Sequence, residues 1–410
     1  MKHAFTLLIL FIVCSCRSVK SPETSKIDPT LNAKAQELAQ QFIITDGHVD
    51  LPYRLKVKNF QLEREYVGIP VRSEEGDFDF IRASKGGLDA PFMSIYIPAT
   101  YEPAGAKALA DSLIDMVNWI AANNADRCMV TKSPAEVKAA KSAGKIALPM
   151  GMENGSPISR IEDVAYFKKR GISYITLTHS KVNQICDSSY DTTRVWNGLS
   201  PFGYEVVDEM TKQGIMIDIS HVSDSTFWDV VKVSPVPVIA SHSSARKFTP
   251  GFERNMADDM IQRMKTNNGV IMINFGSTFL DGEVAIKRRE SQAKLREILE
   301  KEGLDFRDDA AKPIIDKFRE SNPTAFADIS IVADHIDHVV KLAGIDHVGF
   351  GSDFDGVGDS LPTGLKDVSD YPNLIYTLLE RGYSESDIEK ICSGNLFRVW
   401  NEVLAYAETH

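Results

Sequence analysis

The apolar positions of the chain fall into short runs that alternate with helical patterns from about residue 40 onward. Eight runs rich in β-branched residues predict strands at 42–48, 92–98, 145–153, 172–179, 214–221, 236–242, 269–275 and 347–353. Nearly continuous apolar runs imply strands that are buried on both faces, as in parallel sheets. The stretches between them are amphipathic. Residues 133–144, for example, begin with Ser-Pro and end with Gly, which are helix start and stop signals.

Eight strands that alternate with helices predict an α/β fold, a closed (β/α)8 barrel of the TIM type that spans residues 41–410. An open doubly wound sheet would show the same alternation. The commonest version of that sheet is excluded because no Gly-x-Gly-x-x-Gly motif follows the first predicted strand. The last stretch, residues 371–406, is expected to form two helices that close the barrel.

Residues 280–324 interrupt this alternation between the seventh and eighth predicted strands. The segment is dense in charge and has helical spacing, so it predicts a helical insertion on a barrel loop. The insertion is a lid or an interface on one interpretation and a solvated helical hairpin on the other. We favour the solvated hairpin.

The N-terminus has the pattern of an export signal. Lys2 precedes an apolar run from Ala4 to Val13, which is too short to span a bilayer and fits the apolar region of a signal peptide. The sequence Val13-Cys14-Ser15-Cys16 looks like a bacterial lipobox, in which Cys16 would be lipidated after cleavage. We therefore expect a signal peptide over 1–16, a polar tether over 17–40, and an exported, membrane-anchored lipoprotein on the periplasmic or cell-surface side. A soluble secreted protein is the alternative.

The net charge argues against one class of partner, and the cysteine content leaves two alternatives for disulfide bonding. The 410 residues include 46 Lys+Arg and 57 Asp+Glu, a formal charge of −11 with no basic block, so nucleic acid is a poor candidate partner. Cys128, Cys186 and Cys392 remain once the two N-terminal cysteines are assigned to the export signal. Their spacing has no zinc-finger pattern. A Cys128–Cys186 disulfide is one alternative for an exported protein, and plain buried thiols, which we favour, are the other.

Side chains that bind metals or transfer protons recur at the carboxyl ends of the predicted strands, where a barrel carries its active site. They are His48, Asp50, Glu153, His179, His221, His242 and Asp353. A single histidine there is usually a hydrogen-bonded core residue, and an aspartate after a strand often caps the next helix. The occurrence of all seven at strand ends is what favours one shared site.

Nitrogen and oxygen ligands without a nearby cysteine suit zinc or a similar divalent ion. Three histidines with several carboxylates exceed the needs of one tetrahedral ion. They fit two ions roughly 3.5–4 Å apart that share a bridging carboxylate. Such a pair lowers the pKa of a shared water and polarises a carbonyl, so the pattern predicts a metal-dependent hydrolase.

The motifs of the chain, in their order, resemble the renal (membrane) dipeptidase family of zinc metallopeptidases. They are DGHVDLP, GMENG, YITLTHS, GLSPFGYEVVDEM, IDISHVS, SHSSAR, GVIMINF, GFGSDFDG and NLFRVW. The resemblance runs from about residue 42 to 405 and is interrupted by the charged insertion. It implies hydrolysis of the peptide bond of dipeptides by a hydroxide that bridges two zinc ions.

The resemblance also implies a role for each site residue. His48 and Asp50 would hold one zinc ion, His221 and His242 the other, and Glu153 would bridge the two. His179 is similar to the family's residue that contacts the substrate carbonyl and stabilises the tetrahedral intermediate. Asp353 would contact the bridging water and pass its proton to the leaving amine. Arg254, in ERNMADD, matches the family's arginine that binds the terminal carboxylate of the substrate.

The chain departs from the family pattern away from the metal ligands. Lys181 follows LTHS where animal members have a cysteine, so their disulfides do not transfer. Gly276 stands where some relatives have a bulkier side chain that lines the pocket, and the insertion at 280–324 is atypical of short members. Substrate selection and oligomeric state therefore stay open, and a homodimer is an expectation from the family only.

Three hypotheses follow from these observations. The first is an exported dizinc dipeptidase. The second is a related metal-dependent amidohydrolase that acts on cyclic amides, lactones or N-acyl amino acids, and Arg254 discriminates between the two. The third is a non-catalytic surface binding protein, which the presence of Asp353 and every metal ligand argues against.

Overall fold

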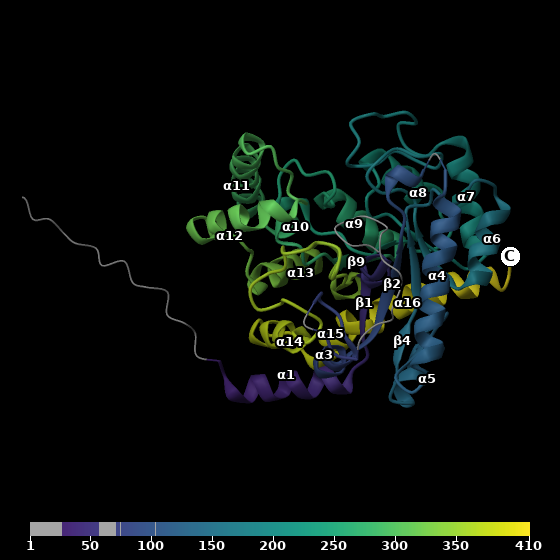
Figure 1. The fold of residues 1–410 in the computed structure, drawn as a ribbon. Coiled ribbons are helices and arrows are strands. Elements are labelled where there is room, and N and C mark those ends of the chain that lie inside the picture. Colours follow the sequence, from purple (N-terminus) through teal and green to yellow (C-terminus); the bar gives the residue numbers. More distant parts are fainter. Residues whose placement is uncertain (1–26, 57–70, 74, 103) are drawn as a thin grey trace, which may run out of the picture.

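Eight parallel strands form one sheet in the computed structural model, which describes residues 27–56, 71–73, 75–102 and 104–410. Neighbours follow the order β1 (Ile44–Val49), β2 (Leu88–Tyr96), β5 (Met150–Glu153), β6 (Ile172–Thr176), β7 (Met216–Asp218), β8 (Ile239–Ala240), β9 (Val270–Ile273) and β10 (Val348–Phe350). The two edges of the sheet meet, because Val49 pairs with Phe354 and the Asp50 N–H donates to the Phe354 carbonyl at 2.8 Å. The predicted (β/α)8 barrel is confirmed (Figure 1).

Helices surround the barrel, and Figure 1 shows them on its outside and at its ends. They are α1 (Pro29–Gln41), α2 (Leu51–Lys56), α3 (Phe80–Gly86), α4 (Ala106–Asn123), α5 (Pro134–Ser142), α6 (Glu162–Arg170), α7 (Pro201–Lys212), α8 (Asp224–Val233), α9 (Asp258–Asn267), α10 (Ser277–Leu280), α11 (Gly282–Lys301), α12 (Lys312–Ser321), α13 (Ile329–Ala343), α14 (Tyr371–Glu380), α15 (Glu385–Glu389) and α16 (Asn395–Ala407).

The local start and stop signals act as expected. Ser133 and Ser200 cap α5 and α7 by accepting hydrogen bonds from the backbone N–H three residues later, and a proline follows each cap. Gly171 ends α6 with a φ of 103°, a left-handed conformation that glycine adopts without steric cost.

The interior of the barrel is closed at one end by α16. Trp400 is fully buried, and its ring lies 5.2 Å from that of Phe92, which in turn stacks on Tyr174 at 5.5 Å. Met216 and Met272 belong to the same buried cluster. Of the two helices expected to close the barrel, α16 does so, whereas α14 packs against α1 and α13. The carboxyl ends of the strands are left as the open face.

One predicted strand is in fact two. Residues 145–153 divide into β4 (Ile146–Leu148), which pairs with β3 (Cys128–Val130) in a separate two-stranded sheet, and β5, which belongs to the barrel. Pro149 lies between them and has no N–H to continue a ladder. The prediction of a single strand over 145–153 was therefore wrong, and β3 was missed.

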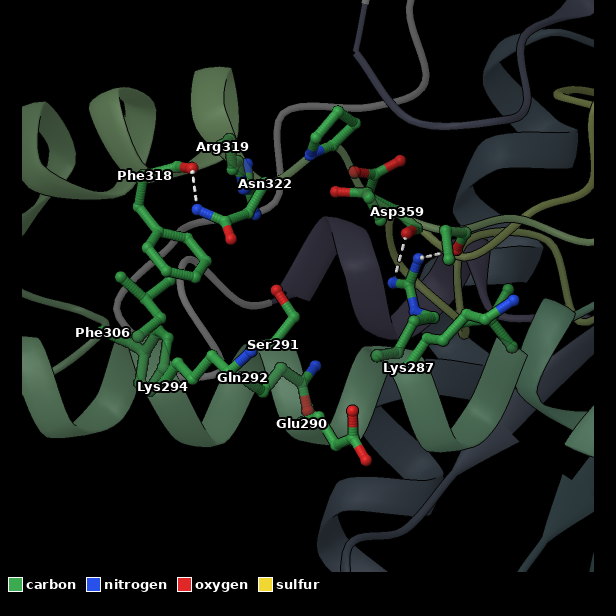
Figure 2. Close-up of a pocket in the computed structure, with 16 residues that line it drawn as sticks. Lys287, Glu290, Ser291, Gln292, Lys294, Phe306, Phe318, Arg319, Asn322 and Asp359 are labelled. Carbon is green, nitrogen blue, oxygen red and sulfur yellow. Dashed lines mark hydrogen bonds between the residues drawn. The ribbon is translucent and has the colours of Figure 1, made fainter. Parts of the chain in front are cut away.

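The predicted insertion is a helical hairpin formed by α11 and α12. It lies between β9 and β10, the seventh and eighth strands of the barrel, and it has a small core of its own around Leu295, Leu299 and Ala311. A cleft of about 560 Å³ lies between α11 and residues 318–325 at the end of α12, and it extends to Val357 and Asp359 in the loop after β10. Figure 2 shows Phe306 and Phe318 at one end of this cleft, and Lys287 and Asp359 at the other.

The tether was predicted too long. Residues 1–16 with Cys16, and the first part of the tether to residue 26, lie outside the described residues, but α1 begins at Pro29 after an Asp28 cap. Ala35, Leu38 and Ala39 are fully buried and pack against α14. Their i, i+3, i+4 spacing is a helical stripe, which is why the segment folds onto the barrel. Among the described residues, none of the helices combines the length and the apolar character needed to cross a membrane.

The three cysteines beyond the N-terminus are separate thiols. Cys128, Cys186 and Cys392 are all free and buried. Of the two alternatives drawn from the sequence, buried thiols are therefore confirmed, and Cys128 and Cys186 do not pair.

Candidate metal centre and active-site cavity

The side chains predicted from the strand ends meet at the open face of the barrel. His48 lies in β1 and Glu153 ends β5, while His179, His221, His242 and Asp353 follow β6, β7, β8 and β10 within a few residues. His48, Asp50, Glu153, His221, His242 and Asp353 are buried, with at most 8 % of each residue exposed. Burial of so many ionisable groups in one place requires that they be paired or bind a cation.

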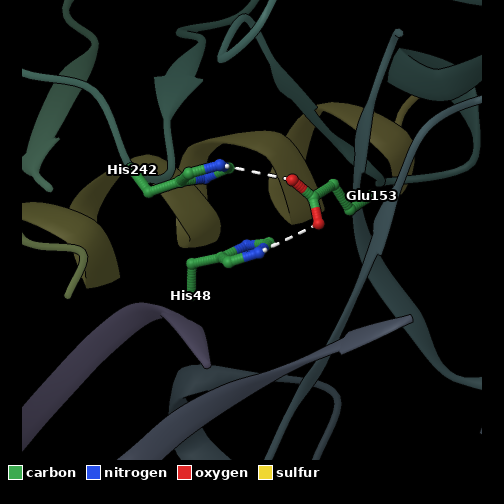
Figure 3. A group of neighbouring side chains, drawn as sticks. All are labelled: His48, Glu153 and His242. Atoms are coloured by element: carbon green, nitrogen blue, oxygen red, sulfur yellow. Dashed lines mark hydrogen bonds and ion pairs between the residues drawn. The ribbon is translucent and has the colours of Figure 1, made fainter. Parts of the chain in front are cut away.

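Glu153 is the centre of this group. Its Oε2 lies 3.2 Å from His48 Nε2, and its Oε1 lies 3.1 Å from His221 Nε2 and 3.4 Å from His242 Nε2. Figure 3 shows the rings of His48 and His242 directed at different oxygens of this carboxylate. His179 Nε2 lies 3.6 Å from Oε1, and Asp50 Oδ2 lies 3.6 Å from His48 Nε2. One carboxylate therefore faces four imidazoles.

Hydrogen bonds to Nδ1, on the side of the ring away from Glu153, fix the tautomers of His48 and His242. The Tyr174 hydroxyl donates its proton to the Gly47 carbonyl at 2.9 Å, so it accepts from His48 Nδ1 at 2.8 Å. The Ser241 hydroxyl donates to Asp218 Oδ2 at 2.6 Å, so it accepts from His242 Nδ1 at 2.7 Å. Each imidazole then presents an Nε2 lone pair to Glu153, the arrangement in which protein groups outside the ligand shell orient metal-binding histidines.

The direction of these lone pairs indicates whether cations fit between the imidazoles and Glu153. An acceptor that faces another acceptor at 3 Å is repelled unless a proton or a cation lies between them. His242 Nε2 lies 2.9 Å from His221 Nε2 as well as close to Glu153. Burial holds the pKa of His221 and that of His242 well below the ordinary value, with help from Arg254 for both and from His48 for His242, so protons do not lie between these two nitrogens and Glu153. His48 differs, because despite its burial Tyr174, Glu153 and Asp50 raise its pKa well above the ordinary value. A divalent cation would satisfy the lone pairs of His221 and His242.

The donor atoms form three overlapping groups whose members lie within 4.8 Å of one another. They are His48–Glu153–His242, Glu153–His179–His221 and His48–Asp50–Asp353. Asp50 Oδ1 and His221 Nδ1 are buried and have no hydrogen-bond partner among the described residues. Imidazole nitrogens with carboxylate oxygens are the donors that zinc prefers when no thiolate is present. The residues therefore fit a metal centre.

The carboxyl groups of the site differ in protonation. Burial would raise the pKa of Glu153, but the imidazoles of His48 and His179 outweigh it and hold that pKa well below the ordinary value. The pKa of Asp353 is raised well above the ordinary value by burial and by the negative charge of Asp50. Asn274 donates to Asp353 Oδ2 at 2.8 Å. One carboxyl group thus stays ionised while the other favours a proton.

The backbone at the site is held in unusual conformations. His221 and Asp353 have φ values of 68° and 63°, in the left-handed region that residues with a Cβ rarely adopt. Such strain concentrates at functional sites, where surrounding contacts enforce it. The strands also approach very closely, since a Cβ on Gly47 would lie 2.3 Å from the Ser241 carbonyl oxygen. Only glycine fits there, one residue before His48.

A cavity of about 500 Å³ opens onto the site. Glu153, His179, His221 and Asp353 line it, together with an aromatic wall that contains Tyr53, Tyr96, Tyr190 and Phe279. The Tyr96 ring packs edge-on against His179 at 4.8 Å and against Tyr53 at 4.9 Å. A volume of this size suits a small-molecule substrate.

Several residues of the site were not predicted from the sequence. Tyr96 and Asn274 stand at the ends of β2 and β9, and Asp218 ends β7. A polar side chain at the end of a buried strand was the available signal for Asn274 and Asp218. Aromatic wall residues such as Tyr190 carry no such signal.

Arg254 lies close to the metal site but does not line the cavity. It is 3 % exposed, and its guanidinium donates to Ser243 Oγ at 2.6 Å and to the His242 carbonyl at 2.8 Å. The same group lies 5.5 Å from the centre of the Phe279 ring, which does line the cavity. Its Nε has no hydrogen-bond partner among the described residues. One donor of Arg254 therefore remains available.

Comparison with known proteins identifies the family. The model of the family described as membrane dipeptidase (peptidase family M19) matches residues 32–410. Dipeptidase tcpJ of Claviceps purpurea is 32 % identical over 376 residues, which cover 87 % of this chain and 76 % of that protein. Dipeptidase 3 of Mus musculus is 31 % identical over 382 residues, which cover 92 % and 67 %.

Solved structures share the fold at lower sequence identity. The probable dipeptidase PvdM from Pseudomonas aeruginosa aligns with a TM-score of 0.76 at 24 % identity, covering 92 % of this chain and 99 % of that one. A metallopeptidase from Rhodobacter sphaeroides, liganded with a phosphinate mimic of the dipeptide L-Ala-D-Ala, aligns with a TM-score of 0.70 at 24 % identity, covering 88 % and 99 %. The family match over residues 32–410 and the two sequence relatives show that this chain belongs to the membrane dipeptidase family of metallopeptidases, peptidase family M19.

Proposed function

We propose that the protein hydrolyses the peptide bond of dipeptides with the help of two zinc ions. His48 and Asp50 would hold one ion, His221 and His242 the other, and Glu153 would contribute an oxygen to each. Bound in this way, the two ions would supply a hydroxide between them as the nucleophile and would polarise the peptide carbonyl. The observation that carries the proposal is the convergence of the Nε2 atoms of His48, His221 and His242 on the carboxylate of Glu153.

Asp353 is the residue that would move protons in the reaction. Its Oδ2 is held by Asn274, which leaves Oδ1 to take up a proton and deliver it to the leaving amine. The raised pKa of this buried carboxyl group suits a group that carries a proton part of the time. His179 stays neutral because burial lowers its pKa, and it would contact the substrate carbonyl from the side of Tyr96.

Arg254 would bind the carboxylate at the end of the dipeptide. Its buried guanidinium beside Phe279 suits a planar carboxylate partner. A related amidohydrolase activity on cyclic amides, lactones or N-acyl amino acids is the second candidate. It is favoured by one observation, namely that Arg254 does not line the cavity.

A dipeptide panel tests both candidates. The purified protein would be analysed for metal content and then assayed on dipeptides of LL and LD configuration, with and without added zinc. We expect release of free amino acids that a chelator abolishes and zinc restores. Arg254→Ala should impair turnover of dipeptides. Unchanged turnover of dipeptides by Arg254→Ala would contradict carboxylate recognition and favour the second candidate.

We also propose that the protein is exported and anchored to a membrane through a lipid on Cys16. The apolar run from Ala4 to Val13 and the cysteine motif that follows support this proposal. Metabolic labelling with a fatty acid should mark the wild-type protein in membranes and leave Cys16→Ala unlabelled. Labelling of Cys16→Ala to the same extent would contradict it.

A further inference from the structure

The loop that carries Arg254 is tied together at its base. Residues 243–256 leave β8 and return, and the two ends pair where the Met256 N–H donates to the Ser244 carbonyl and the Arg246 N–H donates to the Met256 carbonyl, both at 2.8 Å. Ala245 and Met256 form an isolated parallel bridge. The position of Arg254 therefore depends on what holds this paired base.

His335, in α13, holds the base through one ring nitrogen. The ring is fully buried, and its Nδ1 accepts the Ala245 N–H at 3.0 Å. The other nitrogen, Nε2, donates to the Leu280 carbonyl at 2.9 Å. A backbone N–H only donates and a carbonyl only accepts, so only the neutral tautomer with hydrogen on Nε2 makes both bonds. His335 is thus a two-ended link between the Arg254 loop and α10.

The second end of this link reaches the cavity wall. Leu280 is the last residue of α10, and the residue before it, Phe279, lines the cavity beneath the guanidinium of Arg254. Asn255 makes a parallel connection, because its amide donates to the Phe279 carbonyl at 2.7 Å and accepts the Ser244 N–H at 3.1 Å. Two buried side chains therefore set the Arg254 loop against Phe279.

We propose that His335 is a positioning residue for substrate binding, and that with Asn255 it holds the Arg254 guanidinium against Phe279 of the cavity wall, from where it would reach the carboxylate of a dipeptide. This inference rests on the proposed dipeptidase function. His335 does not touch the substrate or the metal ligands. It acts through the loop, so its loss should weaken carboxylate binding more than it slows the chemical step.

The test compares His335→Leu, which removes both bonds, with His335→Gln, whose amide retains one donor and one acceptor. For a dipeptide with a free carboxylate, we expect KM to rise about tenfold in His335→Leu, because a weakened charge-assisted contact to the carboxylate removes uniform binding of the substrate. The value of kcat should change less, and His335→Gln should recover part of the loss. In an Arg254→Ala background, His335→Leu should produce no further rise in KM.

His347 provides a matched control. It is also a buried histidine that bonds to a backbone carbonyl, that of Gly269 at 2.8 Å, but it lies before β10, at the end of the barrel away from the site. His347→Leu should lower stability without changing KM. If His335→Leu does not fold, Asn255→Leu carries the same expectation.

Amide hydrogen exchange separates failure of this inference from failure of the proposed function. His335→Leu should speed exchange in residues 243–256 whether or not the protein cleaves dipeptides. A wild-type protein without dipeptidase activity would contradict the proposed function while leaving the link measurable by exchange. The inference is overturned if folded His335→Leu keeps the wild-type KM, or if its effect persists in full without Arg254.

Discussion

The rim around Glu153 and the α11–α12 hairpin stand on loops of the same barrel, yet they are built in different ways. At the rim, strand ends from across the sequence bring buried ionisable groups together, and hydrogen bonds to Nδ1 fix the rings of His48 and His242. The hairpin is one continuous segment with a core of three buried residues, and many of its charged side chains face water. Its ion pairs, such as Glu297–Lys301 at 2.8 Å, join exposed neighbours on a single helix.

The difference shows where sequence changes are tolerated. Long-range placement leaves no freedom at the rim, since even a Cβ on Gly47 would collide with the Ser241 carbonyl that follows β8. Local pairs on an exposed helix can be exchanged with little consequence. We therefore expect substitutions of similar chemistry to have large effects on function at the rim and almost none in the hairpin.

The largest expected effect is that of Glu153→Gln. The substitution removes the charge that faces four imidazoles, so bound metal should fall well below the wild-type content and dipeptidase activity should drop by roughly 10³-fold or more. Metal analysis of the purified variant and a dipeptide assay measure both. Glu297→Gln is the control, and it makes the same chemical change in the hairpin. Equal losses in the two variants would contradict the contrast.

Asp353→Asn should act on the chemical step rather than on the metal. Loss of the proton carrier is expected to lower kcat by about 10²- to 10⁴-fold, the usual contribution of general acid–base catalysis. Metal content should stay near that of the wild type, because five other ligand side chains remain. Asp359→Asn, six residues along the same loop but on the side of the hairpin cleft, should leave kcat unchanged. A normal kcat in Asp353→Asn would rule out its assigned role.

The rim and the hairpin also differ in how much the sequence revealed. The hairpin was predictable because its helical spacing is local. So were the barrel and the convergence of histidines and carboxylates, which recur at the ends of apolar runs. The Ser241–Asp218 support of His242, the wall residue Tyr96 and the position of Arg254 outside the cavity were not predicted. They depend on which strand ends lie side by side and on how a loop folds back, and a one-dimensional pattern does not contain that information.

The errors in the fold have equally local causes. Pro149 divides an apolar run that reads as one strand, and its missing N–H decides where the barrel strand begins. The first helix was taken for a tether because only three small or apolar residues, Ala35, Leu38 and Ala39, mark its buried face. So short an apolar face does not by itself predict a packed helix, and its role becomes clear only from the contact of α1 with α14.

His335 bonds to the Arg254 loop and to the end of α10, which directly precedes the α11–α12 hairpin. It should make the free energy of unfolding depend on pH. Burial lowers its pKa from 6.5 to about 4, so between these values the unfolded chain binds a proton that the folded protein does not. The stabilisation is present above pH 6.5 and is lost as the pH falls toward 4. The predicted loss is about 3 kcal/mol.

Unfolding by urea at pH 7 and at pH 4.5, with a chelator present so that metal binding does not contribute, measures this effect. His335→Leu lacks the titrating group and should show a smaller decrease in the free energy of unfolding than the wild type. Equal decreases in the two proteins would show that His335 is not held neutral by the fold. That result would also contradict the proposed link between the Arg254 loop and α10, because the link requires the neutral tautomer of His335.

The smallest expected effects are those of two variants, one at the rim and one in the hairpin. The first should change zinc affinity but not stability, and the second should change stability but not zinc affinity. Tyr174→Phe removes the hydroxyl that orients His48 and leaves the ring packing intact, so zinc affinity should fall about 10- to 100-fold while stability changes little. Leu295→Ala removes apolar volume from the hairpin core, so stability should fall while zinc affinity stays the same. Competition with a chelator of known affinity measures the first quantity, and chemical unfolding measures the second. If Leu295→Ala weakened zinc binding as much as Tyr174→Phe, the hairpin would support the metal centre. The two regions would then be one cooperative unit, not a rigid rim with an independent insertion.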